Sequence, residues 1–179
     1  MDSSDAARLI GRAVLPGQRW ADLGAGRGTF TTALARLLGP TGTVYAIERD
    51  PSATRVLDAL ARDHDVEGSR IVVVHADFTQ PLQLPLLDGA LLANALHFVQ
   101  AELQADVVRR IVDGVGSEGS MVIVEYDNRP PSRWVPFPVS LTRLAALAAE
   151  ARLEVPELIG RRRSAFGGNM YAARLARRP

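Results

Sequence analysis

The chain of 179 residues contains no cysteine and no lysine. The absence of cysteine excludes disulfide bonds, thiolate zinc sites and covalent catalysis by a thiolate. The absence of lysine excludes a lysine general base and a lysine Schiff base, because both need the side-chain amine. All 21 strongly basic residues are therefore arginine.

Histidine is scarce, and long apolar runs are missing. The three histidines, His64, His75 and His97, lack the spacing of a metal site, so we expect no metal. No apolar stretch reaches the length that crosses a membrane, and the N-terminus lacks the apolar core of a signal peptide. We therefore expect a cytoplasmic protein without a membrane partner.

The overall composition is that of an ordinary globular protein. Hydrophobic residues make up 47% of the chain and charged residues 23%, and the length fits one domain over residues 1–179. The net charge of +1 gives no general attraction to nucleic acid. The run Arg161 to Arg163 and the last residues are locally basic, which leaves a local nucleic-acid contact open.

Strand and helix patterns alternate along the chain, which is typical of an α/β fold with a mainly parallel sheet. Apolar runs predict buried strands over residues 20–23, 43–48, 70–76, 87–94 and 120–126. After each of the first two strands, apolar residues recur at helical spacing. A helix before the fifth strand is predicted by the positions of Leu103, Val107, Ile111 and Val115. A Gly-Gly-Asn turn at 167–169 separates two further strands at 157–164 and 170–175.

A glycine-rich turn follows the first predicted strand. Residues 21–28 read ADLGAGRG, and Gly24, Gly26 and Gly28 allow the backbone to turn sharply and to approach a ligand closely. A dinucleotide fingerprint would place its third glycine at position 29, where this chain has Thr29. A second acidic residue, Glu48, ends the next apolar run. The pattern indicates a nucleoside cofactor site.

The spacing DxGxGxG, with Asp22 two residues before Gly24, resembles motif I of the class I S-adenosylmethionine-dependent methyltransferases. The resemblance implies an α/β fold with a doubly wound, mostly parallel seven-stranded sheet, Rossmann-like, whose last strand is antiparallel. The hairpin-like end of the chain agrees with that implication. The implied cofactor is S-adenosyl-L-methionine, and the implied activity is methyl transfer.

The resemblance also implies roles for particular residues. Asp22, Gly24, Ala25 and Gly26 correspond to the methionine end of the cofactor site. The carboxylate of Glu48, followed by Arg49, corresponds to the acceptor of both ribose hydroxyl groups. Residues that correspond to the adenine and amine ends of the site follow the third and fourth strands. Asp77 corresponds to the acceptor of the adenine amino group, the backbone N–H of Phe78 to the group that meets the ring, and the backbone carbonyl of Asn94 to a group that helps hold the methionine amine.

The acceptor side is less defined. His97, in the sequence NALHF, is a candidate general base, and the alternative is a histidine that only packs against the following helix. Tyr126 and Asp127 are weaker candidates. The chain has NALH where DNA amino-methyltransferases have (N/D)PP(Y/F), and it lacks the cysteine and lysine used by the cytosine-C5 and ribose 2'-O enzymes. The NALHF form resembles that of small-molecule methyltransferases of the broad bacterial type, which implies a small-molecule acceptor.

Two other functions remain open at this stage. One is an RNA or protein methyltransferase that uses the Arg-rich C-terminal part, and the other is a cofactor-binding module without catalysis. The proline-rich residues 129–138 are expected to cover the substrate. In the alternative, Trp134 and Phe137 fill the core or form a contact within a homodimer.

Overall fold

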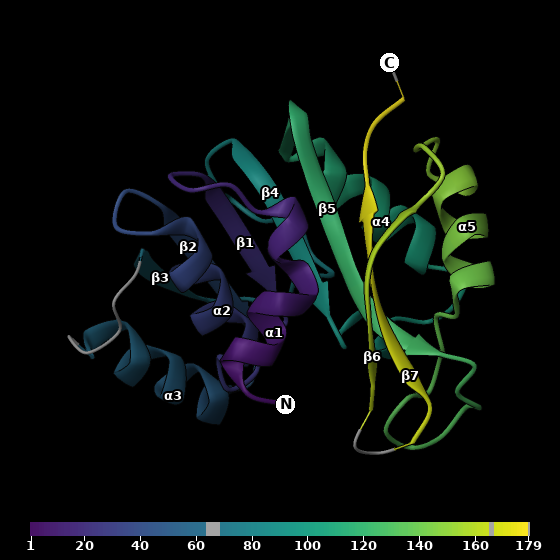
Figure 1. The fold of residues 1–179 in the computed structure, drawn as a ribbon, viewed down its shortest axis with the longest axis horizontal. Helices are drawn as coiled ribbons and strands as arrows, with labels where there is room; N and C mark the ends of the chain where they lie inside the picture. Colours follow the sequence, from purple (N-terminus) through teal and green to yellow (C-terminus); the bar gives the residue numbers. More distant parts are fainter. Residues whose placement is uncertain (64–68, 165–166, 179) are drawn as a thin grey trace.

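The computed structural model describes residues 1–63, 69–164 and 167–178, so His64 lies outside the described part of the chain. One seven-stranded sheet runs through it in the order β3-β2-β1-β4-β5-β7-β6 (Figure 1). The strands are β1 (Arg19–Leu23), β2 (Thr43–Glu48), β3 (Arg70–His75), β4 (Leu87–Ala93), β5 (Val115–Asp127), β6 (Glu157–Arg163) and β7 (Asn169–Leu175). β7 pairs antiparallel with β5 and β6, and the other pairings are parallel. The predicted fold is confirmed.

Helices cover both faces of the sheet (Figure 1). They are α1 (Ser3–Ile10), α2 (Thr29–Leu38), α3 (Pro51–Arg62), α4 (Gln104–Asp113) and α5 (Leu141–Glu150), with short 3-10 turns η1 (Gly11–Ala13) and η2 (Leu96–Phe98). Apolar residues of α1 and α2 pack on one face, and those of α4 and α5 pack on the other. The alternation of side chains along each strand fills both layers.

Asp50 and Pro51 show why α3 begins where the sequence predicts. The Asp50 carboxylate accepts hydrogen bonds from the backbone N–H groups of Ser52 and Ala53, at 2.8 and 2.9 Å. Pro51 occupies the first helical position, where no intrahelical N–H is needed. The cap fixes α3 directly after β2, and so holds the residues at the end of β2 in place.

The start of β5 differs from the prediction. Val115 was expected on the apolar stripe of the preceding helix, but it is the first residue of β5 and pairs with Leu87. Leu103 is the residue before α4 rather than a member of it. The sequence GVGSEG hides the early strand, because its glycines and polar residues give no apolar alternation.

The strand order places the ligand crevice. β1 lies between β2 and β4, so the chain leaves β1 in one direction along the sheet and later returns on its other side. Ligands of open α/β sheets bind at such a switch point, beyond the carboxyl ends of the strands. The residues that follow β1, β2, β3 and β4 therefore meet at one edge of the sheet.

Candidate functional site

The glycine loop after β1 has the backbone that its sequence predicts. Gly24, Gly26 and Gly28 have φ values of 74°, 56° and 88°, a region that favours glycine. A Cβ atom on Gly24 would lie 2.9 Å from the Cβ of Ala95, which is too close, whereas a Cβ on Gly26 would meet nothing within 4 Å. The open space at Gly26 leaves its backbone accessible to a ligand.

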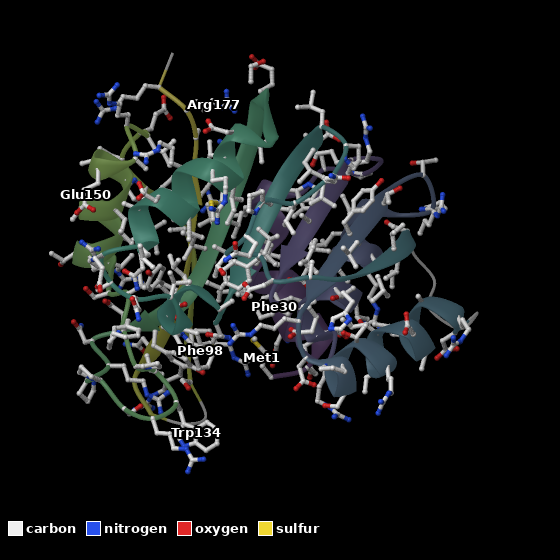
Figure 2. All side chains as sticks on the ribbon, turned by 180° about the vertical axis from the view of Figure 1, so that it is seen from behind. Met1, Phe30, Phe98, Trp134, Glu150 and Arg177 are labelled. Atoms are coloured by element: carbon white, nitrogen blue, oxygen red, sulfur yellow. The ribbon has the colours of Figure 1, made fainter. Side chains whose placement is uncertain are left out.

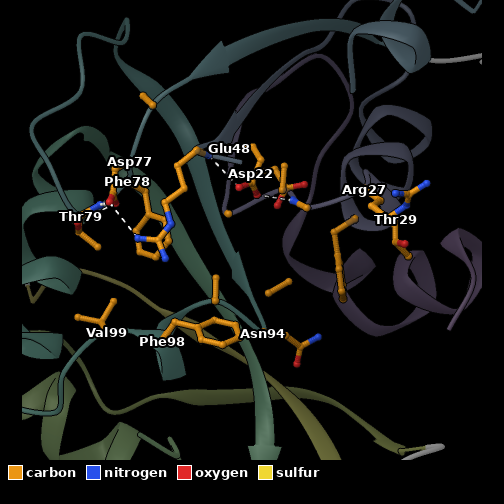
Figure 3. Close-up of a pocket in the computed structure, with 18 of the residues that line it drawn as sticks. Asp22, Arg27, Thr29, Glu48, Asp77, Phe78, Thr79, Asn94, Phe98 and Val99 are labelled. Carbon is orange, nitrogen blue, oxygen red and sulfur yellow. Dashed lines mark hydrogen bonds and ion pairs between the residues drawn. The ribbon is translucent and has the colours of Figure 1, made fainter. Parts of the chain in front are cut away.

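A cavity of about 470 Å³ opens beside this loop, at the carboxyl ends of the parallel strands (Figure 3). Every residue predicted to bind cofactor lines it: Asp22, Gly24, Ala25, Gly26, Glu48, Arg49, Asp77, Phe78 and Asn94. Residues that the sequence did not indicate also line it, among them Met1, Arg27, Thr29, Thr79, Phe98 and Val99. The structure thus brings the predicted cofactor residues together.

Glu48 fastens the end of β2 to the glycine loop. Its Oε2 accepts a hydrogen bond from the Gly26 N–H at 2.8 Å. Its Oε1 accepts from the N–H groups of Arg49 and Asp50, at 2.8 and 2.9 Å. These bonds hold the carboxylate at the wall of the cavity, so it does not have to be ordered when a ligand binds.

Asp77 is held at one end of the cavity, on the side away from Arg27 and Thr29 (Figure 3). Its Oδ1 accepts from the backbone N–H and the hydroxyl of Thr79, at 2.8 and 2.7 Å, and its Oδ2 pairs with Arg49 at 3.2 Å. Burial acts to raise the pKa of Asp77, but the bonds from Thr79 and Arg49 outweigh it and hold this pKa below its usual value. The carboxyl group is therefore an ionised acceptor at neutral pH.

Asp22 differs from the other acids of the cavity because it is 1% exposed. The hydroxyl of Thr31, a residue that the sequence did not indicate, donates to its Oδ2 at 2.6 Å. Burial raises the pKa of Asp22 to about 7, and the charge of Glu48 adds to this rise, while the bond from Thr31 opposes it. A cation bound nearby would favour the ionised carboxylate.

We expect Asp22→Asn to stabilise the ligand-free protein at high pH. Asp22 ionises near pH 3.8 in the unfolded chain and near pH 7 in the folded one. Between these values the unfolded state releases the proton first, so the parent loses stability as pH rises, whereas the amide does not. The advantage of the variant in unfolding free energy should grow by roughly 2–3 kcal/mol between pH 5 and pH 8, measured by urea unfolding. If the unfolding free energies of variant and parent differed by the same amount at pH 5 and at pH 8, the prediction would be contradicted.

Asn94 stands between this cavity and a second one. Its backbone has φ of 53°, and its Oδ1 is buried without a hydrogen-bond partner among the described residues. An unpartnered buried acceptor is costly, and a donor on a bound ligand would relieve that cost. Asn94 lines both cavities, and Phe98 does the same.

The second cavity has a volume of about 460 Å³ and lies at the ends of β4 and β5. It is lined by Asn94, His97, Phe98, Tyr126, Arg129, Trp134 and Val135. His97, the predicted base, therefore lies at the second cavity and not at the first. Because Asn94 and Phe98 are shared, two ligands bound in the two cavities would be neighbours.

His97 is paired with a carboxylate that the sequence did not indicate. Its Nδ1 lies 2.7 Å from Oε2 of Glu125, and its backbone N–H donates to Oε1 at 3.1 Å. Glu125 is fully buried and His97 nearly so. Such a carboxylate orients the imidazole and leaves Nε2 for other partners. A charged residue inside the apolar run MVIVEY needs a buried partner, so Glu125 was the feature of the sequence that could have indicated this pair.

Of the two weaker candidates for catalysis, only Tyr126 lies at one of the two cavities. Tyr126 lines the second cavity, and burial raises the pKa of its hydroxyl, against the effect of the nearby Arg129. This group stays protonated at neutral pH and is unsuited as a base. Asp127 accepts from the N–H of Leu141 at 3.3 Å and lines neither cavity.

Residues 129–138 run beside the second cavity. The Phe137 N–H donates to the carbonyl of His97 at 3.0 Å, and Val135 is buried, so the later half is fixed to the body of the protein. Trp134 is 71% exposed and lies at the same end of the molecule as Phe98 (Figure 2). Trp134 is therefore not a core residue. Its position is compatible both with a cover over the substrate and with a contact to a second copy of the chain.

The described residues show no group of three or more histidine and acidic side chains placed to hold a metal ion. Among the same residues, no helix is long and apolar enough to cross a membrane.

Comparison with known proteins identifies the family. A model of the methyltransferase domain family matches residues 21–119, which is more than half of the chain. A curated relative, ribosomal RNA small subunit methyltransferase H of Acidobacterium capsulatum, is 33% identical over 110 residues, covering 59% of this chain and 36% of the relative. A carboxy-S-adenosyl-L-methionine synthase of Methylococcus capsulatus is 27% identical over 120 residues, covering 66% of this chain and 49% of the relative. The chain thus spans half or less of these relatives' lengths.

Solved structures support the same fold. Mitomycin 7-O-methyltransferase has a TM-score of 0.73 at 18% identity, covering 98% of this chain and 54% of the other. Magnesium protoporphyrin IX methyltransferase of Synechocystis, with bound S-adenosylmethionine, has a TM-score of 0.70 at 14% identity, covering 98% and 77%. The family match confirms the expected class and its cofactor, S-adenosylmethionine: the chain belongs to the methyltransferase domain family.

Proposed function

We propose that residues 1–179 form one catalytic domain that transfers a methyl group from S-adenosylmethionine to a small-molecule acceptor. The observation that carries this proposal is the pair of adjoining cavities, of about 470 and 460 Å³, with Asn94 and Phe98 in the wall between them. One cavity holds the residues expected for the cofactor, and the other holds His97. Methyl transfer needs such an arrangement, since donor and acceptor must be aligned side by side.

The residues of the first cavity fit the chemical groups of the cofactor. Glu48 offers a fixed carboxylate for two ribose hydroxyl groups, and Asp77 offers an ionised acceptor for the adenine amino group. The unpartnered Oδ1 of Asn94 is an acceptor suited to an ammonium group. Asp22 places a carboxyl beside the glycine loop, where a cation would hold it ionised.

When bound, S-adenosylmethionine supplies an electrophilic methyl group on a cationic sulfur. Because this donor is already activated, the residues of the chain mainly exclude water and align the acceptor. His97 accepts the proton of the acceptor through Nε2, while Glu125 holds the ring through Nδ1 and stabilises the imidazolium that forms. The proton then passes to water.

The Arg-rich C-terminal part supports the RNA or protein alternative less well. β6, one of the two edge strands of the sheet, carries Arg161, Arg162 and Arg163, and none of them lines either cavity. Arg162 is paired with Asp5 of α1 at 2.6 Å. Charged residues on an edge strand also serve to prevent pairing with other chains, which accounts for them without a ligand.

Calorimetry tests the cofactor half of the proposal. We expect the protein to bind both S-adenosylmethionine and S-adenosylhomocysteine, and to bind NAD more weakly than either. The reason is that Asp77 and Asn94 are placed for an amino group of the base and an ammonium group, and NAD has no counterpart to the second. Tighter binding of NAD than of S-adenosylmethionine would contradict the proposal.

A further inference from the structure

We propose that the acceptor is a flat aromatic compound that carries a hydroxyl group and a negative charge. This inference rests on the proposed methyl transfer and concerns the second cavity, which has no assigned ligand. Its volume of about 460 Å³ lies within the range of small-molecule pockets, about 300–1,000 Å³. The chemistry of its walls decides which small molecules fit.

Aromatic rings form most of the wall. Phe98 and Trp134 are 54% and 71% exposed, although large aromatic side chains usually bury most of their surface. The ring centre of Phe98 lies 4.4 Å from that of His97, and the ring centre of Tyr126 lies 6.2 Å from that of His97. In both pairs the ring planes are tilted relative to each other. Rings that face a cavity from several sides favour a flat ligand, which can stack on some of them and meet others at their edges.

One arginine, Arg129, gives the wall a positive charge. Its guanidinium lies 4.6 Å from the centre of the Tyr126 ring, and the guanidinium of Arg133, which does not line the cavity, lies 5.5 Å from the centre of the Trp134 ring. Among the described residues that line this cavity, none is a carboxylate, and Glu125 lies fully buried behind His97. An anionic substituent on the acceptor is thus attracted, whereas a cationic one is repelled.

A histidine base at this cavity indicates that the methylated group is a hydroxyl. A hydroxyl on an aromatic ring has a pKa of about 10, far closer to the range of a histidine base than that of an aliphatic alcohol. Its proton goes to Nε2 of His97, the oxygen forms a bond to the methyl carbon, and the bond from that carbon to sulfur breaks with its electron pair left on sulfur. The charges balance, because the sulfur becomes neutral as the imidazole becomes cationic.

Binding of three probes in the presence of S-adenosylhomocysteine tests the inference. The probes are 6-hydroxy-2-naphthoate, its fully saturated decalin counterpart, and 2-naphthol, which lacks the carboxylate. By calorimetry we expect 6-hydroxy-2-naphthoate to bind at least tenfold more tightly than the saturated acid, because only the flat ring stacks on the wall. We also expect it to bind more tightly than 2-naphthol.

Two variants and a control place the ligand. Trp134→Ala should weaken binding of 6-hydroxy-2-naphthoate about tenfold, as expected for the loss of one aromatic contact. Arg129→Gln should remove most of its advantage over 2-naphthol. Val155→Ala changes an apolar side chain that is 85% exposed and lines neither cavity, so it should change nothing.

Three results would overturn the inference: equal binding of the flat and the saturated acid, unchanged affinity in Trp134→Ala, or no measurable binding of 6-hydroxy-2-naphthoate by a protein that binds S-adenosylhomocysteine. A protein that fails to bind S-adenosylhomocysteine would instead contradict the proposed function, so the two failures are distinguishable.

Discussion

Replacing His97 with glutamine is expected to lower kcat by about 100-fold or more, because a positioned general base contributes about 10²–10⁴. The side chain lines the second cavity and is oriented by Glu125 at 2.7 Å. Glutamine keeps a polar side chain of similar length but cannot take the proton. Turnover would be measured with the acceptor that receives labelled methyl groups from the cofactor in a cell extract.

The controls for this variant separate catalysis from packing. Affinity for S-adenosylhomocysteine should stay within about twofold of the parent, since His97 does not line the first cavity. Glu125→Gln should lower kcat less than His97→Gln, because Glu125 acts only through the histidine. Preserved turnover together with a lower melting temperature would show that His97 only packs.

Glu48→Ala should weaken S-adenosylmethionine binding by about 1.5–3 kcal/mol, or roughly 10- to 150-fold. The substitution removes a charged acceptor at the wall of the first cavity and releases the N–H groups of Gly26, Arg49 and Asp50. Calorimetry measures the affinity. Glu48→Gln retains an oxygen acceptor but loses the charge, so its affinity should fall between those of the alanine variant and the parent.

Glu150→Ala is the matched control. Glu150 lies on α5 (Figure 2), lines neither cavity and pairs with Arg143 at 3.1 Å. An exposed pair of this kind contributes little, so cofactor affinity should not change. Equal affinities of Glu48→Ala and the parent would remove Glu48 from the cofactor site.

The sequence could predict which residues meet at the first cavity, because each of its parts follows a recognisable strand. The glycine loop comes directly after β1, Glu48 ends β2, and Asp77 follows β3. In a parallel sheet these ends meet at one edge whatever the details of packing. Local sequence and a general rule of topology were therefore enough.

The second cavity could not be predicted in the same way. The pairing of His97 with Glu125 joins the turn η2, which follows β4, to a residue of β5 that is 28 positions away. The wall near Trp134 depends on a loop without regular structure. The hydroxyl of Thr31 under Asp22 is a similar case, since a threonine in a helix carries no local sign of its partner. Such contacts arise from tertiary packing and not from periodicity.

Helix α1 was also missed. It has eight residues, and only Ala6, Leu9 and Ile10 are buried, so its apolar stripe is short. Isolated helices of this length are marginal, and packing on α2 and β6 supplies most of the stability.

Transfer of a labelled methyl group from S-adenosylmethionine into a cell extract tests the central claim most directly. The parent, His97→Gln and Glu48→Ala would be compared, and the products separated into small molecules, RNA and protein. We predict that the parent labels a small aromatic compound, and that both variants do so far more slowly. Label found only in RNA or protein, or no label at all from a protein that binds the cofactor, would contradict the account.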